Sequence, residues 1–176
     1  LRDIDAVSQI VESTVIDQKS GPDGAQTFLD GRDVSQEIRT PEMSLAASDI
    51  SAISTVRQRL VKLQQEMGRQ GGVVMEGRDI GTVVLPEADL KVFLDAEPEE
   101  RARRRYLQWQ EQGIEVEQEQ LTREILTRDQ RDKTRKVAPL VPAGDAALID
   151  TTRLAPGQVL DRILALLSEQ GLLEER

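Results

Sequence analysis

Arginine and aspartate side chains stand where predicted elements end, and they are the residues of this chain best suited to chemistry. Arg78 and Asp79 follow the apolar run 73–75 and a Glu-Gly pair. Such a run is short enough for a buried strand, and ligands of open α/β sheets bind beyond the carboxyl ends of strands. A guanidinium beside a carboxylate can hold a phosphate and a hydrogen-bonding base or sugar together. The alternative is a solvated turn with a surface ion pair.

Charged residues also recur on one face of a helix predicted over 117–135. Arg128, Asp132 and Arg135 are four and then three residues apart, so they share a face, and Arg131 lies beside it. The alternative is the solvated side of a helix.

A third arginine cluster lies in the run 99–105, which contains Arg103 and Arg104. Guanidinium groups grip phosphate oxygens in a fork, so clustered arginines near a strand end indicate phosphate binding. The alternative is a solvated helix face with ion pairs four residues apart. The starts of two further predicted helices are flanked by Arg39, Ser48 and Arg57. Taken singly, each of these residues is better interpreted as solvated surface than as a ligand contact.

Composition narrows the chemistry. The 176 residues suit one compact domain with a small insert. The absence of cysteine and histidine excludes disulfides, thiolate metal sites and the usual general base, and it fits a reducing cytoplasm. A net charge of −9 argues against a nucleic-acid polymer as partner. No apolar run is long enough for a membrane span, and no signal peptide is visible.

The elements that must position these residues form an α/β pattern. Strands are predicted over 73–75, 90–94 and 146–150, and helices over 98–113, 117–135 and 156–170. This alternation predicts a parallel sheet with flanking helices.

The beginning of the chain has a different character. A hairpin is predicted from the β-like runs 14–16 and 27–29 around a Gly-Pro-Asp-Gly turn, with a third strand over 34–38. Helices follow from Thr40-Pro41 and from Ser54 to the Gly71-Gly72 break, and 1–12 resembles the end of a helix from a longer chain. The expected division separates residues 1–70, with an antiparallel insert at about 13–38, from an α/β core over residues 71–176, with a lid at about 97–116.

Four blocks of the chain together resemble a known family. They are EIRTPE at 37–42, VVMEGRDIGTVVLPEADLKVFLDA at 73–96, EERARRRYLQ at 99–108 and RDQRDKTRKVAPLVPAGDA at 128–146. In this order they closely resemble bacterial cytidylate kinases, which are nucleoside-monophosphate kinases with a P-loop core. The resemblance implies a P-loop-type parallel sheet and transfer of the ATP γ-phosphoryl group to CMP or dCMP in pyrimidine nucleotide metabolism.

The resemblance also assigns roles. It implies that residues 1–70 bind the monophosphate and that the CMP pocket contains Arg39, Ser48, Arg57 and Asp79, with the last three nearest the base. Phosphate contacts are expected from Arg78 and Arg128, ribose contacts from Asp132 with Arg135 close by, and further catalytic arginines are Arg131, Arg103 and Arg104. No residue is expected to be a metal ligand.

One family feature is absent from the sequence. The family's GxxGxGKS-type phosphate loop does not occur in residues 1–176, and neither does a DTGAMYR-like segment. The resemblance implies that the missing strand is the central one of five, between the strands at 73–75 and 90–94. Mg²⁺ would be held mainly by ATP and the phosphate loop, so residues 1–176 alone are expected to be nearly inactive.

Other interpretations remain at this point. The chain is expected to be a monomer, or a segment of a longer or fused chain. An alternative function is a non-catalytic nucleotide-binding or interaction module that has lost its phosphate loop. Another is a kinase for UMP or AMP, although the RDxRDxxRxxAPL block and the hairpin argue against it.

Overall fold

The computed structural model describes residues 4–21, 24–51, 53–69, 71–111, 113–134 and 139–173. The chain forms two compact units, Leu1–Val73 and Val74–Arg176, and each is described by itself.

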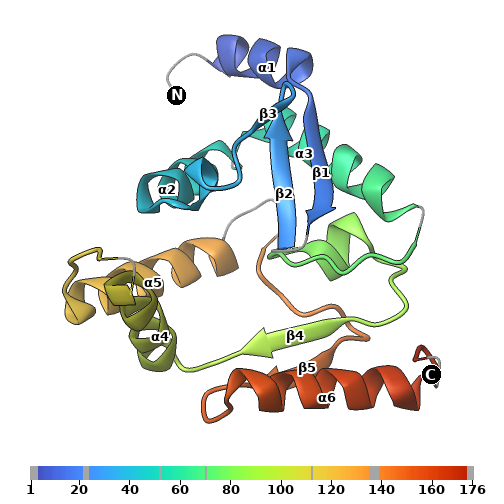
Figure 1. Cartoon of the computed structure of the whole chain (residues 1–176), viewed down its shortest axis with the longest axis vertical. Coiled ribbons are helices and arrows are strands. Elements are labelled where there is room, and N and C mark those ends of the chain that lie inside the picture. The colour runs from blue at the N-terminus through green and yellow to red at the C-terminus, as the bar shows by residue number, and fades with distance from the viewer. Residues whose placement is uncertain are drawn as a thin grey trace. The chain divides into compact units, whose positions relative to one another are not determined.

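The first unit combines a small antiparallel sheet with three α-helices (Figure 1). In chain order its elements are α1 (Ile4–Ser13), β1 (Ile16–Gly21), β2 (Gly24–Leu29), β3 (Arg32–Asp33), the 3₁₀ turn η1 (Glu37–Arg39), α2 (Pro41–Ile50) and α3 (Ser54–Gly68). The predicted hairpin is confirmed, because β1 pairs antiparallel with β2 in a register that places Ile16 opposite Leu29.

The third strand was predicted too late in the chain. β2 turns directly into β3 through Asp30 and Gly31, which both have positive φ (50° and 81°). Asp-Gly favours such a two-residue turn because its backbone twist matches that of the flanking strands. The strand ends after Asp33, whose carboxylate accepts hydrogen bonds from the backbone and hydroxyl of Ser35.

α2 begins where capping chemistry predicts. Thr40 Oγ1 accepts a hydrogen bond from the Met43 backbone N–H (3.3 Å), and Pro41 occupies the first turn of α2. α1 packs against α3, and the hydroxyls of Ser8 and Thr55 lie 2.7 Å apart.

The second unit contains the parallel strands and the helices α4, α5 and α6 (Figure 1). Its elements are the π-helical turn η2 (Ile80–Val84), β4 (Val92–Asp95), α4 (Pro98–Glu111), α5 (Gln118–Thr134), β5 (Ala147–Asp150) and α6 (Pro156–Glu169). β4 and β5 pair in parallel, with Asp95 opposite Asp150 at their carboxyl ends, which confirms the predicted parallel arrangement. α4 packs against α5.

The strand predicted over 73–75 is wrong for this structure. Residues 72–76 have no strand pairing among the described residues, and the Val74 side chain is fully exposed. A strand exists only through a partner that takes its backbone hydrogen bonds, and the pattern of apolar residues cannot supply that partner. Among the described residues, no helix has both the length and the apolar character needed to cross a membrane.

Candidate functional site

Arg78 lies in a tight turn that directly precedes η2. The backbone carbonyl of Asp79 accepts hydrogen bonds from the N–H groups of Thr82, Val83 and Val84 (2.9–3.3 Å), which begins the π-helical turn. A Cβ at Gly77 would lie 2.9 Å from the Ile80 side chain, so glycine permits this close approach. Such π turns are frequent at functional sites. The turn buries Asp79 and leaves the Arg78 side chain half exposed.

α5 supplies the carboxylate that holds Arg78. Asp132 Oδ2 lies 3.3 Å from Arg78 Nε and 3.8 Å from Arg128 Nε, and only 9% of the Asp132 side chain is exposed. Arg128 and Asp132 share a face of α5, as their spacing of four predicts. The structure therefore brings together three residues that the sequence singled out, from a turn and a helix about fifty residues apart in the chain.

The guanidinium group of Arg105 also affects Arg128 electrostatically. Burial, followed by the positive charges of Arg78 and Arg105, lowers the pKa of Arg128 below its usual value, although Asp132 opposes the shift. Arg105 lies one turn beyond Arg101 on α4, and Arg101 pairs with Asp129, the neighbour of Arg128 on α5. Two guanidinium groups beside one buried carboxylate, with the charge of a third acting on Arg128, form a place where an anion is favourable. Among the described residues, the buried Nε of Arg128 has no hydrogen-bond partner.

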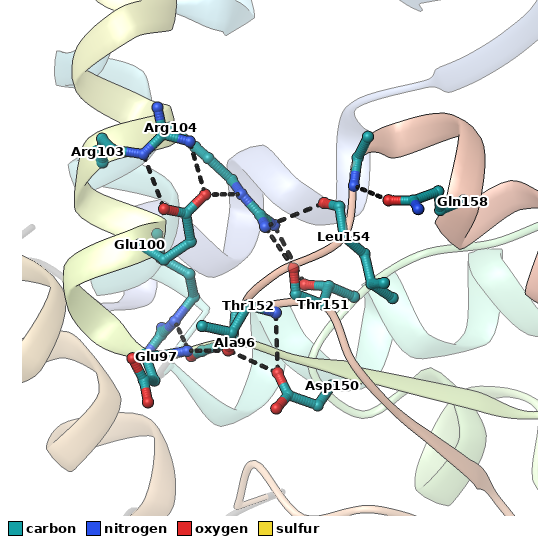
Figure 2. A network of polar contacts seen from close by, with 12 residues as sticks. Ala96, Glu97, Glu100, Arg103, Arg104, Asp150, Thr151, Thr152, Leu154 and Gln158 are labelled. Atoms are coloured by element: carbon teal, nitrogen blue, oxygen red, sulfur yellow. Dashed lines mark hydrogen bonds and ion pairs between the residues drawn. The ribbon is translucent and has the colours of Figure 1, made fainter.

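The predicted lid arginines face different ways. Arg103 pairs with Glu100 at the surface, and Arg104 reaches the loop that follows β5. Figure 2 shows both side chains meeting Glu100, with Arg104 continuing to Thr151 and Leu154. Arg105 was not among the catalytic residues chosen from the sequence. The signal that could have selected it is Trp109, one turn further along α4, whose ring lies 5.7 Å from the Arg105 guanidinium carbon.

Arg101 has a structural partner. Its guanidinium group donates to both carboxylate oxygens of Asp129 and to the backbone oxygen of Ala96 (2.9 Å), so it ties α4 to α5 and to the end of β4. Burial opposes the charge of Arg101, but the hydrogen bonds to Asp129 outweigh it and raise the pKa of the arginine.

The other predicted residues lie elsewhere or outside the described residues. Arg131 is exposed on α5, and Arg135 lies outside the described residues. In the first unit, Arg57 is half-buried on α3, and Ser48 lies on α2 with a side chain outside the described set. Arg39 is exposed at the end of η1 and lines a hollow of about 450 Å³ with residues of β2 and the turn after β3.

A second hollow, of about 460 Å³, lies at the carboxyl ends of β4 and β5. Its charged lining residues are Asp95, Glu97, Arg101, Asp129, Lys133 and Asp150. Carboxylates outnumber cations there, so a phosphate group is less favourable in this hollow than beside Arg78 and Arg128.

Comparison with known proteins places this chain in one family. The family model described as "Cytidylate kinase" matches residues 1–169. A cytidylate kinase of Caldicellulosiruptor bescii is 53% identical over 161 residues, which cover 91% of this chain and 71% of the relative. Cytidylate kinases of Caldicellulosiruptor saccharolyticus (47% identical, covering 93% and 73%) and Enterococcus faecalis (46%, covering 94% and 73%) are similarly close. The chain belongs to the cytidylate kinase family.

Proposed function

We propose that this protein is a nucleoside-monophosphate kinase that transfers the γ-phosphoryl group of ATP to CMP or dCMP. The observation that carries the proposal is the meeting of Arg78 and Arg128 around the buried carboxylate of Asp132, with the charge of Arg105 acting on Arg128. The family membership supports the same reaction and its substrates.

The proposed site suits phosphoryl transfer because this reaction needs alignment and charge neutralisation more than covalent help. An oxygen of the CMP phosphate attacks the γ-phosphorus of ATP, the bond from that phosphorus to the β,γ-bridging oxygen breaks, and ADP and CDP leave. Arg78, Arg105 and Arg128 would neutralise the phosphate oxygens during this step.

The carboxylate of Asp132 acts on the arginines rather than on a proton. It lies 3.3 Å from Arg78 Nε, so it orients that guanidinium group and limits repulsion among the three cations. The same residue is the predicted contact to the ribose hydroxyls. No proton-transfer residue is needed in this scheme, which agrees with a chain that contains no histidine.

Recognition of the base is assigned to Asp79. Its buried carboxylate would accept a hydrogen bond from the exocyclic amine of cytosine, which uracil lacks. Arg39, Ser48 and Arg57 remain further predicted contacts to CMP, Arg131 and Arg135 remain predicted neighbours of the phosphate and ribose, and Arg103 and Arg104 remain predicted lid arginines.

The described portion of the chain contains no cluster of side chains that could serve as a magnesium site. No group of three or more aspartate, glutamate, histidine or cysteine side chains there has a metal-binding arrangement. ATP would bring the ion as a nucleotide complex, and none of the described residues is given a role in holding it.

A non-catalytic nucleotide-binding module is the second candidate, and the sequence itself favours it in one respect. Residues 1–176 contain no GxxGxGKS motif, whose backbone N–H groups and lysine would cradle the ATP phosphates. We expect residues 1–176 alone to bind CMP and to show little turnover. Joined to a phosphate-loop segment of the GxxGxGKS type, they should phosphorylate CMP and dCMP faster than UMP and AMP.

A coupled ADP-release assay with these four monophosphates tests the proposal. Turnover of CMP and dCMP by the joined chain supports the kinase. Binding of CMP without turnover in the joined chain would support the module, and equal rates with UMP would contradict the assigned pocket. Rapid turnover by residues 1–176 alone would show that this chain needs no such phosphate loop.

A further inference from the structure

Arg104 joins α4 to the loop after β5 through a set of hydrogen bonds (Figure 2). Its Nη1 donates to Thr151 Oγ1 (3.2 Å), and its Nη2 donates to the backbone oxygens of Thr151 and Leu154. Its Nε donates to Glu100 Oε1 at 2.8 Å. One guanidinium group thus bonds a carboxylate on its own helix and three oxygens of another segment, which leaves it little freedom to turn.

Thr151 is a firm point of attachment. It is buried, its backbone N–H donates to the carbonyl of Asp95 (2.7 Å), and its hydroxyl donates to the same carbonyl (3.0 Å). Asp95 ends β4, and Thr151 directly follows β5. Arg104 is therefore anchored, through Thr151, to the carboxyl ends of both parallel strands.

The neighbouring residue points to a different partner. Successive residues of an α-helix are about 100° apart around its axis, so Arg104 and Arg105 cannot face the same way. Arg105 lies one turn beyond Arg101 on α4, and Arg101 pairs with Asp129 of α5, the neighbour of Arg128. Residues four apart share a helix face, so Arg105 lies on the side of α4 that meets α5, where its charge acts on Arg128. The Arg105 guanidinium group also lies over the Trp109 ring.

We propose that Arg104 is a positioning residue, which fixes the rotation of α4 through Thr151 and Leu154 and thereby keeps Arg105 directed toward Arg128 and the phosphate. The inference rests on the proposed phosphate site. It differs from the expectation that Arg104 itself touches phosphate, because the described contacts of Arg104 are to Glu100, Thr151 and Leu154.

A double-mutant cycle tests this role in the full chain. The quantity measured is the phosphate-dependent affinity ratio, the Kd of cytidine divided by the Kd of CMP, from calorimetry or from the fluorescence of Trp109, the one tryptophan in the chain. We expect Arg105→Ala to lower this ratio about 10-fold and Arg104→Ala to lower it about 5-fold, in the range of coupled neighbouring residues. In the Arg105→Ala background, Arg104→Ala should change the ratio by less than about 2-fold, because residues that act as a unit are not additive.

Two further variants keep the test sharp. Thr151→Val removes one oxygen that Arg104 contacts while keeping the shape of the side chain, so it serves if Arg104→Ala unfolds, and its smaller effect should also vanish in the Arg105→Ala background. Arg123→Ala is the matched control, since Arg123 is an exposed arginine on α5 with a 3.9 Å contact to Glu119, and it should leave the ratio unchanged.

Three results would overturn the inference. Additive losses in the double mutant would mean that Arg104 contacts phosphate independently of Arg105. A lower melting temperature with an unchanged ratio would mean that the bonds only stabilise the fold. A wild-type chain that binds CMP no better than cytidine would overturn the phosphate site and this inference together, so the two failures are distinguishable.

Discussion

Asp132 Oδ2 lies 3.3 Å from Arg78 Nε, which joins a buried carboxylate of α5 to the arginine that precedes the π-helical turn η2. The same oxygen lies 3.8 Å from Arg128 Nε. One negative charge therefore lies beside two cations, and the charge of Arg105 also acts on one of them, Arg128. Under the proposed function, this local positive charge would hold a phosphate group on a chain whose net charge is −9.

Asp132→Asn should destabilise the second unit and make its stability depend on anions. Removing the carboxylate leaves the guanidinium groups to repel one another, at a cost of about 1–3 kcal/mol. We expect Asp132→Asn to have a lower melting temperature by calorimetry. Added inorganic phosphate should raise that melting temperature by more than it raises the melting temperature of the wild type. Equal gains from phosphate in both proteins would show that Asp132 does not balance this cluster.

Glu100→Gln should change how stability depends on acid pH. Hydrogen bonds from Arg103 and then Arg104 lower the pKa of Glu100 from 4.5 to about 2. Because the folded-state pKa is lowered, the stability from this carboxylate is present above about pH 4.5 and is lost as the pH falls toward 2. Between pH 5 and pH 2, the melting temperature of the wild type should therefore fall further than that of Glu100→Gln. Parallel curves would contradict this, since other lowered carboxyl pKa values, such as that of Asp150, are shared by both proteins.

Arg105→Ala should weaken CMP binding more than Arg103→Ala. The charge of Arg105 acts on Arg128, whereas Arg103 is paired with Glu100 at the surface. We expect about a 10-fold loss for Arg105→Ala, on the scale of one charge-assisted hydrogen bond, and a smaller loss for Arg103→Ala. Calorimetric titration with CMP measures both. A larger loss of CMP affinity in Arg103→Ala would contradict this prediction and support the role that the sequence assigned to Arg103.

Prediction from the sequence worked best where local chemistry decides the structure. The start of α2 follows from Thr40 and Pro41, and the shared face of Arg128 and Asp132 follows from their spacing. These features depend only on residues within one or two turns of a helix. The family resemblance was likewise carried by short ordered blocks, and the family model matches residues 1–169.

Features that depend on distant partners could not be predicted in the same way. The apolar run 73–75 indicates a strand, yet no strand pairs with it among the described residues. The π-helical turn η2 arises because the Asp79 carbonyl accepts several N–H groups, which no periodic pattern signals. Arg104 and Arg105 are the same residue type in adjacent positions, and the long-range contact of Arg104 with Thr151, which separates their roles, has no signal in the sequence.

Asp79→Asn should relax the choice between cytosine and uracil. The amide keeps an acceptor for the cytosine amine and gains a donor for the corresponding uracil oxygen. We expect the preference for CMP over UMP to fall about 10-fold or more, because a site built for a hydrogen bond discriminates by leaving its polar group unpaired. Binding constants for both nucleotides give this ratio, and an unchanged ratio would place the base elsewhere.

The most direct test of the phosphate site is calorimetric titration of CMP and cytidine into the wild type, Arg128→Gln and the control Arg123→Gln. Both substitutions remove one guanidinium group from α5, but only Arg128 lies beside Asp132 and Arg78. We expect the wild type and Arg123→Gln to bind CMP more tightly than cytidine, and Arg128→Gln to lose this advantage by roughly 10- to 100-fold while binding cytidine normally. An advantage for CMP that survives in Arg128→Gln would contradict the proposed phosphate site.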